Sequence, residues 1–172
     1  MQDRRVEDQK DWTDGHVARW LPVLPDLDPD VEGAVTRAKL LAQHLRRVRE
    51  KSLADFDLQR PEFDTLHALA GRHGRAVPSQ LADDLNLAPP SVTARIDALV
   101  ARGFVRRTPS ATDRRRVDIE LTEQGRAAWL GAMDVLGDEE YRLLGALSAD
   151  ERRTLSDLLR RIMLAAERPP SS

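Results

Sequence analysis

The sequence predicts a mainly helical protein with one small β element, and three observations support this prediction. Apolar residues recur at three- and four-residue spacing over most of the 172 residues, which is typical of amphipathic helices. Residues 78–103 read as two short helices joined by a tight turn. Residues 104–121 read as two short strands joined by a basic loop. This order of elements predicts a winged helix-turn-helix.

The N-terminal part is expected to supply helices outside that motif. Residues 1–10 are charged and lack periodicity, which indicates a disordered tail. Residues 11–24 carry apolar side chains at helical spacing and predict a short amphipathic helix, followed by a proline-containing linker at 26–30. A longer helix is predicted over 31–54, and Pro61 suits the first turn of the next one, over 62–72.

The two helices of the central motif have recognisable ends. Pro78 opens the first, and Asn86 is expected to stop it. The second begins at Ala88-Pro89-Pro90-Ser91, because proline needs no amide hydrogen in a first turn, and ends at Gly103. Its inward stripe is predicted to be Val92, Ile96, Leu99 and Val100, and its outer face to be Ser91, Thr93, Ala94 and Arg95. Small, hydrogen-bonding side chains on that face suit close approach to a DNA groove.

A basic island follows. Residues 104–107 and 117–121 predict the two strands, and the second alternates apolar and polar positions as a half-buried strand does. Between Arg95 and Arg116 lie seven arginines and two aspartates, although the whole chain carries a net charge of −2. Local positive charge of this kind is typical of a DNA contact. The alternative interpretation of these arginines is a solvated surface loop that binds nothing.

The C-terminal part is expected to form two further helices. Thr122 is a good N-cap for a helix to about residue 147, and Ser148 with Glu151 forms a capping-box pattern for a last helix to about 167. The apolar stripes at both ends of the chain exceed what one small core needs, so a homodimer formed by the N- and C-terminal helices is expected. The predicted domains are a tail (1–10), N-terminal helices (11–60), a DNA-binding domain (61–121) and C-terminal dimerisation helices (122–168).

Composition excludes several classes of protein. There is no apolar run long enough to span a bilayer and no apolar segment of a secretion signal at the N-terminus, so a cytoplasmic protein without membrane contact is expected. The absence of cysteine excludes disulfides and thiol-based redox sensing. The four histidines are scattered, so neither a metal nor another cofactor is expected. The sequence contains no glycine-rich phosphate loop, no nucleophile elbow and no paired carboxylates of the kind that enzymes use, so an enzyme is not expected.

The stretch LADDLNLAPPSVTARIDALVARGFVRR, followed by TDRRRVDIELTEQGR, closely resembles the MarR family of bacterial transcription regulators. The resemblance implies a homodimer that binds a pseudo-palindromic operator in double-stranded DNA, with one recognition helix per subunit in the major groove and a wing in the minor groove. It places Ser91, Thr93 and Arg95 on the recognition helix. It also implies that Asp113 orients the wing and that Arg114 or Arg115 enters the minor groove. Arg106 and Arg116 of the basic island complete the predicted DNA-binding residues.

The N-terminal helix further resembles the urate-responsive branch of that family. By this resemblance Trp20, Asp64, Arg95 and Arg107 would form a purine site. Urate is a planar anion, which suits an aromatic face and guanidinium donors. Asp64 is expected to hold Arg95 or Arg107 in the free protein, and the ligand to break that pair and favour a conformation that binds DNA poorly.

The predicted function is therefore a DNA-binding regulator, with repression as the family tendency, released by a small anionic aromatic ligand such as urate or a related purine. Alternative ligands are phenolic compounds and a signalling nucleotide. A helical protein-interaction module without ligand sensing is the alternative of another class.

Overall fold

The computed structural model describes residues 9–109 and 117–168, which form seven helices and three short strands. The contact pattern divides the chain into two compact units, residues 1–48 and residues 49–172. Each unit is described separately. Mainly helical structure with a small sheet confirms the predicted fold class.

The N-terminal unit contains α1 (Trp12–Trp20) and most of α2 (Pro29–Asp55). Asp11 caps α1 and forms a capping box with Asp14, and Arg37 of α2 donates hydrogen bonds to both carboxylates at 2.7–3.1 Å. The helix ends four residues earlier than the predicted boundary. Pro22 has no amide hydrogen to continue the helical ladder, so the remaining residues form a turn.

The C-terminal end of α2 lies in the second unit, where hydrogen bonds and side-chain packing hold it. Asp57 takes the left-handed conformation (φ 51°), and Leu58 N–H donates to Leu53 O at 2.8 Å, which is the Schellman pattern of a helix stop. The buried Ser52 hydroxyl donates to Ala132 O at 3.1 Å. At Gly131 of α6, an added Cβ would overlap the ring of Phe56, so the ring occupies the space that the glycine leaves.

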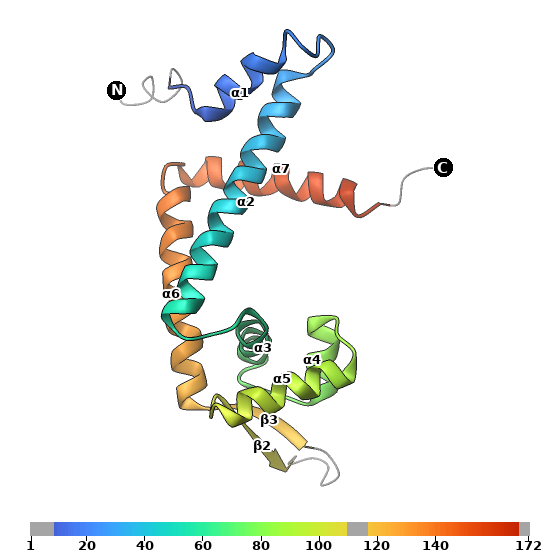
Figure 1. Cartoon of the computed structure of the whole chain (residues 1–172), viewed down its shortest axis with the longest axis vertical. Helices are drawn as coiled ribbons and strands as arrows, with labels where there is room; N and C mark the ends of the chain where they lie inside the picture. Colours follow the sequence, from blue (N-terminus) through green and yellow to red (C-terminus); the bar gives the residue numbers. More distant parts are fainter. Residues whose placement is uncertain (1–8, 110–116, 169–172) are drawn as a thin grey trace. The chain divides into compact units, whose positions relative to one another are not determined.

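Helices α4 (Pro78–Leu85) and α5 (Pro89–Ala101) form the predicted helix-turn-helix, and α3 (Arg60–Gly71) packs against both (Figure 1). Both predicted helix stops are confirmed, since Asn86 (φ 50°) follows α4 and Gly103 (φ 73°) follows α5 in left-handed conformations. The shared core consists of side chains that are at most 1% exposed: Leu66, Leu69, Leu81, Val92, Ile96 and Leu99. Three of the four predicted inward positions of α5 are therefore fully buried, and the fourth, Val100, is half-buried.

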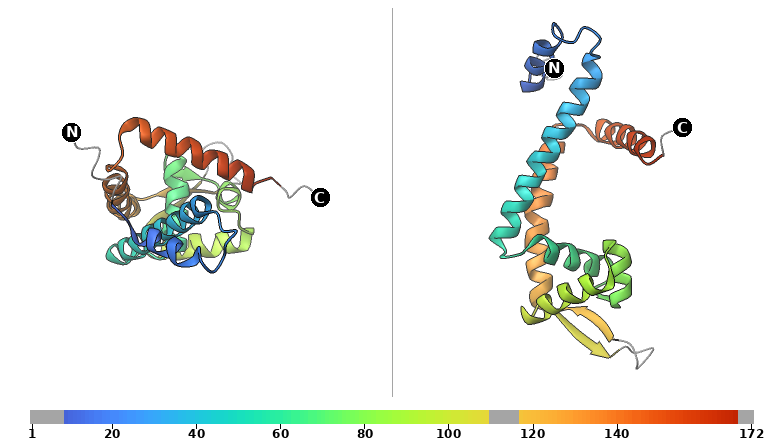
Figure 2. Two further views of the ribbon diagram at one scale, coloured as in Figure 1. Left: turned by 90° about the horizontal axis from the view of Figure 1, so that it is seen from above. Right: turned by 45° about the vertical axis from the view of Figure 1, so that its right-hand side comes forward.

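A three-stranded antiparallel sheet packs with these helices, with strand order β1-β3-β2. Helices α3, α4 and α5 together with this sheet are called the lobe below. The sheet comprises β1 (Arg75–Ala76), β2 (Val105–Pro109) and β3 (Val117–Leu121). The right-hand view of Figure 2 shows β2 and β3 at the end of the lobe, beyond α5. The two predicted strands are confirmed. The sequence prediction missed β1.

The last two helices are α6 (Glu123–Leu144) and α7 (Ala149–Ala166). The predicted caps are present: Thr122 Oγ1 accepts from Gly125 N at 3.1 Å, and Ser148 forms a capping box with Glu151. No residue of α7 is buried. Five of its large apolar side chains are 46–61% exposed, namely Leu158, Leu159, Ile162, Met163 and Leu164. Within the described residues, none of the helices is long and apolar enough to cross a membrane.

Candidate DNA interface and ligand pocket

The outer face of α5 is small and polar. Ser91, Thr93 and Ala94 are exposed, on the side away from the buried stripe. The Thr93 hydroxyl donates to Pro89 O at 3.1 Å, which leaves its oxygen lone pairs free to accept from a base edge. No bulky side chain of this stretch separates the helix backbone from an approaching groove, and this arrangement suits a recognition helix.

Four arginines of the basic island lie in the described residues, and they differ in how they are paired. Arg102 contacts Glu62 at 2.6 Å, Arg106 contacts Glu120 at 2.8 Å, and Arg107 contacts Asp97 at 2.6 Å. Arg95 is half-buried and has no carboxylate within ion-pair distance in the described part of the chain. Much of the apparent positive charge is therefore neutralised within the lobe.

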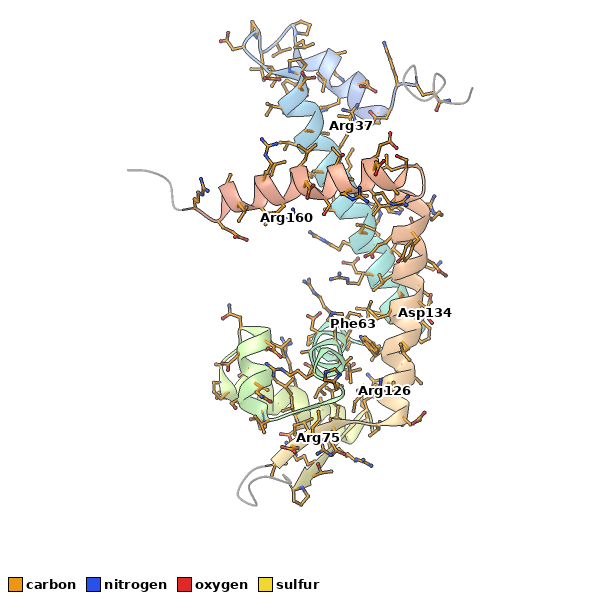
Figure 3. The ribbon with its side chains drawn as sticks, turned by 180° about the vertical axis from the view of Figure 1, so that it is seen from behind. Arg37, Phe63, Arg75, Arg126, Asp134 and Arg160 are labelled. Carbon is orange, nitrogen blue, oxygen red and sulfur yellow. The ribbon has the colours of Figure 1, made fainter. Side chains whose placement is uncertain are left out.

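The sheet holds two arginines by buried carboxylates. Glu120 of β3 accepts from Arg106 of β2 and from Arg75 of β1, which also lies 3.8 Å from Asp118 (Arg75 is labelled in Figure 3). The Arg106 hydrogen bond lowers the pKa of the Glu120 carboxyl below its usual value, and the nearby Arg75 charge acts in the same direction. Glu120 therefore stays ionised at neutral pH as the partner of both guanidinium groups.

The expected alternation of β3 is wrong in detail. Asp118 and Glu120 are both 7% exposed, whereas Val117 is 44% exposed. The stems of long arginine side chains cover the polar face of the strand, which sequence alternation does not reveal. Arg75 was missed as a candidate residue because it lies on a two-residue strand that carries no periodic signal.

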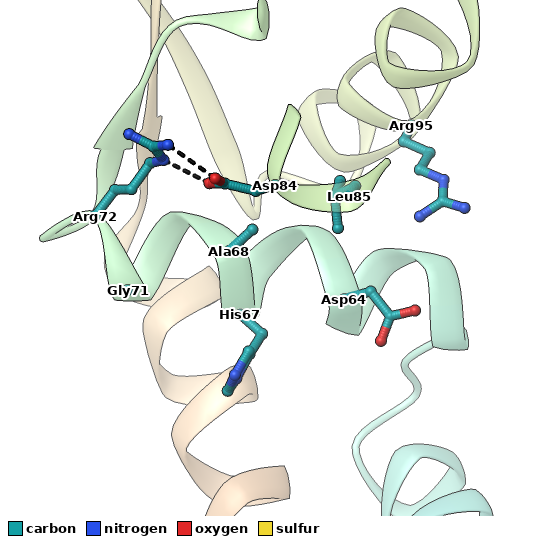
Figure 4. Close-up of a pocket in the computed structure, with 8 residues that line it drawn as sticks. All are labelled: Asp64, His67, Ala68, Gly71, Arg72, Asp84, Leu85 and Arg95. Atoms are coloured by element: carbon teal, nitrogen blue, oxygen red, sulfur yellow. Dashed lines mark hydrogen bonds and ion pairs between the residues drawn. The ribbon is translucent and has the colours of Figure 1, made fainter. Parts of the chain in front are cut away.

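A pocket of 760 Å³ lies between α3, α4 and α5 (Figure 4). Asp64, His67, Arg72, Asp84 and Arg95 supply its polar lining. Arg72 donates two hydrogen bonds to Asp84, at 2.5 and 2.8 Å, and this pair lowers the pKa of the Asp84 carboxyl. Figure 4 shows this pair at one end of the pocket, and Asp64 and Arg95 at the other. The Arg72–Asp84 pair was not predicted, because nothing in the sequence brings these two residues together.

Two of the four predicted purine-site residues, Asp64 and Arg95, line this pocket. The expected pair between Asp64 and either Arg95 or Arg107 is not formed. Asp64 lies 3.9 Å from Arg60, one helical turn away, and Arg107 binds Asp97 instead. Asp64 and Arg107 thus each have another partner and Arg95 has none among the described residues, so the expected bond is not there for a ligand to break.

Trp20 lies on α1 in the N-terminal unit and is 42% exposed. There it lines a separate pocket of 260 Å³, together with His16, Leu24, Leu27 and Glu32. His16 stacks on Trp12 with ring centroids 5.1 Å apart, and its Nε2 is 3.1 Å from Glu32. The structure thus places Trp20 against a histidine and a carboxylate of its own unit.

Four of the remaining predicted DNA-binding residues, Asp113, Arg114, Arg115 and Arg116, lie outside the described residues. Arg106, from the first wing strand, is 67% exposed despite its contact with Glu120.

Comparison with known proteins gives a consistent result. The sequence model of the MarR family matches residues 56–116. The transcriptional regulator PecS of Dickeya dadantii is 32% identical over 151 residues, which cover 85% of this chain and 89% of PecS. The transcriptional repressor NicR of Pseudomonas putida is 33% identical over 115 residues, 66% of this chain and 72% of NicR.

Among solved structures, a mutant MarR from E. coli is 27% identical, with a TM-score of 0.59, covering 74% of this chain and 94% of that one. The extent of the match to PecS, the family model and this shared fold lead to one conclusion. The chain belongs to the MarR family of DNA-binding transcriptional regulators, with a winged helix-turn-helix formed by α3, α4, α5 and the sheet.

Proposed function

We propose that this protein is a homodimeric repressor that leaves its operator when a small anionic aromatic molecule, urate or a related purine, binds beside the recognition helix. The observation that carries this proposal is Arg95. Its guanidinium is half-buried at the wall of the α3–α5 pocket and has no carboxylate partner among the described residues. A partly desolvated cation without a partner favours an anion in the pocket.

Asp64 adds the second requirement of the ligand. It lies on α3 at the same end of the pocket as Arg95 of α5 (Figure 4). A purine anion carries both oxygen acceptors and N–H donors, which match a guanidinium and a carboxylate on two different helices. The ligand would therefore join Arg95 to Asp64, where the sequence suggested that it would separate them. Such a bridge links α5 to α3, and binding of the ligand favours whichever position of α5 allows that bridge.

A repressor needs two recognition helices to bind a two-fold operator. The exposed apolar face of α7, together with Trp12, Val31 and Val35 of the N-terminal unit, offers surface that a second copy would cover. Repression as the direction of control follows the family tendency, and the similar protein NicR is a transcriptional repressor.

The test has two parts. Fluorescence anisotropy of a DNA fragment from upstream of this protein's own gene should fall when urate is added at fixed salt, while salicylate has no effect. Calorimetry without DNA should then show urate binding that weakens at least about tenfold in Arg95→Gln, because a charge-assisted hydrogen-bond pair is lost. Arg153→Gln, which removes an exposed arginine of α7, should leave it unchanged.

A second variant, Trp20→Ala, tests whether the Trp20 ring contacts the bound ligand. Weaker urate binding in this variant would place Trp20 at the same ligand, whereas unchanged binding would restrict the site to the α3–α5 pocket. Unchanged binding in Arg95→Gln would overturn the proposal. Release of DNA by salicylate and by no purine would make the protein a regulator that responds to phenolic compounds.

A further inference from the structure

Arg102 lies at the C-terminal end of the recognition helix. It is the C-cap of α5, and Gly103 in the left-handed conformation closes the helix behind it, with Phe104 N–H donating to Leu99 O at 2.9 Å. Only 28% of the Arg102 side chain is exposed. Its direction is therefore fixed by the helix stop and by the groups that surround its guanidinium.

Those groups come from two other helix ends. Nη1 donates to the Glu62 carboxylate at 2.6 Å, and Nη2 donates to the Asp57 backbone oxygen at 2.5 Å and to its carboxylate at 2.8 Å. The guanidinium also lies over the Phe104 ring, 4.6 Å from the centroid. Charged hydrogen bonds and a cation–π contact thus hold the guanidinium from several sides.

Each partner is itself held in place. The Glu62 carboxylate, 12% exposed, also accepts from Gln59 N at 2.8 Å and so caps the first turn of α3. Asp57 is the left-handed residue of the α2 stop, and that end of α2 is anchored on α6 by the Ser52–Ala132 hydrogen bond. The anchor for Arg102 consequently combines a carboxylate that caps α3 with a backbone oxygen at the α2 stop, while the Asp57 carboxylate itself is 93% exposed.

We propose that Arg102 is a positioning residue for DNA recognition, which sets the orientation of α5 by tying its C-terminal end to the end of α2 and the start of α3. The arrangement is also electrostatically favourable. A cation lies at the negative ends of two helices, and the Glu62 carboxylate lies at the positive end of a third. This inference rests on the DNA-binding activity of the family and is independent of any ligand.

The competing interpretation is that Arg102 belongs to the basic island and binds a DNA phosphate. The two interpretations predict different salt dependence. A phosphate contact adds about 0.9 to the slope of log affinity against log salt concentration. A guanidinium committed to Glu62 and Asp57 releases no counterion from DNA, so its removal weakens binding without changing that slope.

The experiment measures operator affinity by anisotropy at several salt concentrations, without ligand, for Arg102→Gln and Arg102→Lys. We expect Arg102→Gln to bind at least about tenfold more weakly, since hydrogen bonds to charged groups contribute at this level, with the slope unchanged. Lysine keeps the charge but lacks the planar fork, so the affinity of Arg102→Lys should be intermediate. Arg142→Gln on α6, which also loses a paired arginine, should match the original protein.

Glu62→Gln gives a second test with an opposite sign. It retains an amide oxygen for the Gln59 cap and removes one negative charge. If Arg102 binds phosphate, freeing it from Glu62 strengthens DNA binding, whereas loss of a positioning contact weakens it. Circular dichroism must show each variant folded at the assay temperature. Unchanged affinity in Arg102→Gln, a slope reduced by about 0.9, or stronger binding by Glu62→Gln would each overturn the proposal.

Discussion

Helices α5 and α7 both carry a continuous apolar stripe, yet the two stripes are in opposite environments. Val92, Ile96 and Leu99 of α5 are at most 1% exposed, whereas Leu159 and Ile162 of α7 are 47% and 61% exposed. These three α5 side chains are buried within their own unit, while α7 presents a surface that the rest of its unit does not cover. Apolar periodicity alone identifies a helix and does not say what the helix packs against.

The largest expected effect comes from the buried stripe. Leu99→Ala should lower the free energy of unfolding by about 2–5 kcal/mol, because it removes buried methyl groups and leaves a cavity. Urea denaturation followed by circular dichroism measures this loss. A loss below about 1 kcal/mol would mean that the α5 core collapses around the smaller side chain.

The exposed stripe should respond differently. If α7 forms the proposed homodimer interface, Ile162→Glu should raise the dissociation constant of the dimer at least about tenfold, since a carboxylate in an apolar interface is costly to desolvate. Sedimentation equilibrium measures the constant. Arg160→Gln, on the same helix and exposed, is the control and should leave the dimer intact. A dimer that tolerates Ile162→Glu would show that α7 is not its interface.

The polar contacts of the lobe should depend on pH. The Glu120 pKa is lowered in the folded chain, chiefly by Arg106, so its stabilising effect is present above the usual carboxyl value of 4.5 and is lost as the pH falls through the folded value. The urea midpoint of Glu120→Gln should lie below that of the original protein at pH 6, and the two should converge in acid. A constant difference across this range would exclude the ion pairs as its cause.

The smallest effect is expected on α7. Arg153 and Asp150 form an ion pair in which the side chains are 74% and 89% exposed. Water and salt screen such a pair, so Arg153→Gln should change the free energy of unfolding by less than about 0.5 kcal/mol. A larger loss in the same urea assay would indicate that this end of α7 is covered in the dimer.

The central motif was predictable because its signals are local. Pro89 and Gly103 mark the ends of α5 through their own backbone preferences, and the spacing of Val92, Ile96 and Leu99 needs only the helical repeat. The α1 boundary was less accurate because the apolar pattern continues past Pro22, where hydrogen bonding cannot.

The partners of the arginines were not predictable, because they depend on tertiary geometry. The sequence groups Arg102 with the DNA-contacting island, but folding brings it to Glu62, 40 positions earlier. It also brings Arg75 to Glu120, 45 positions later. Charge counts therefore indicated where the positive charge is concentrated, and did not indicate how much of it is already neutralised.

Phe56 and Gly131 have a consequence for how the sequence can vary. Glycine inside a helix usually costs about 1 kcal/mol relative to alanine, so Gly131→Ala would ordinarily be a stabilising change. Here the new methyl group would meet the Phe56 ring, so the ring, α6 or the α2–α3 turn would have to shift. The two positions therefore form a size-matched pair: a larger residue at 131 requires that the ring at 56 move or become smaller.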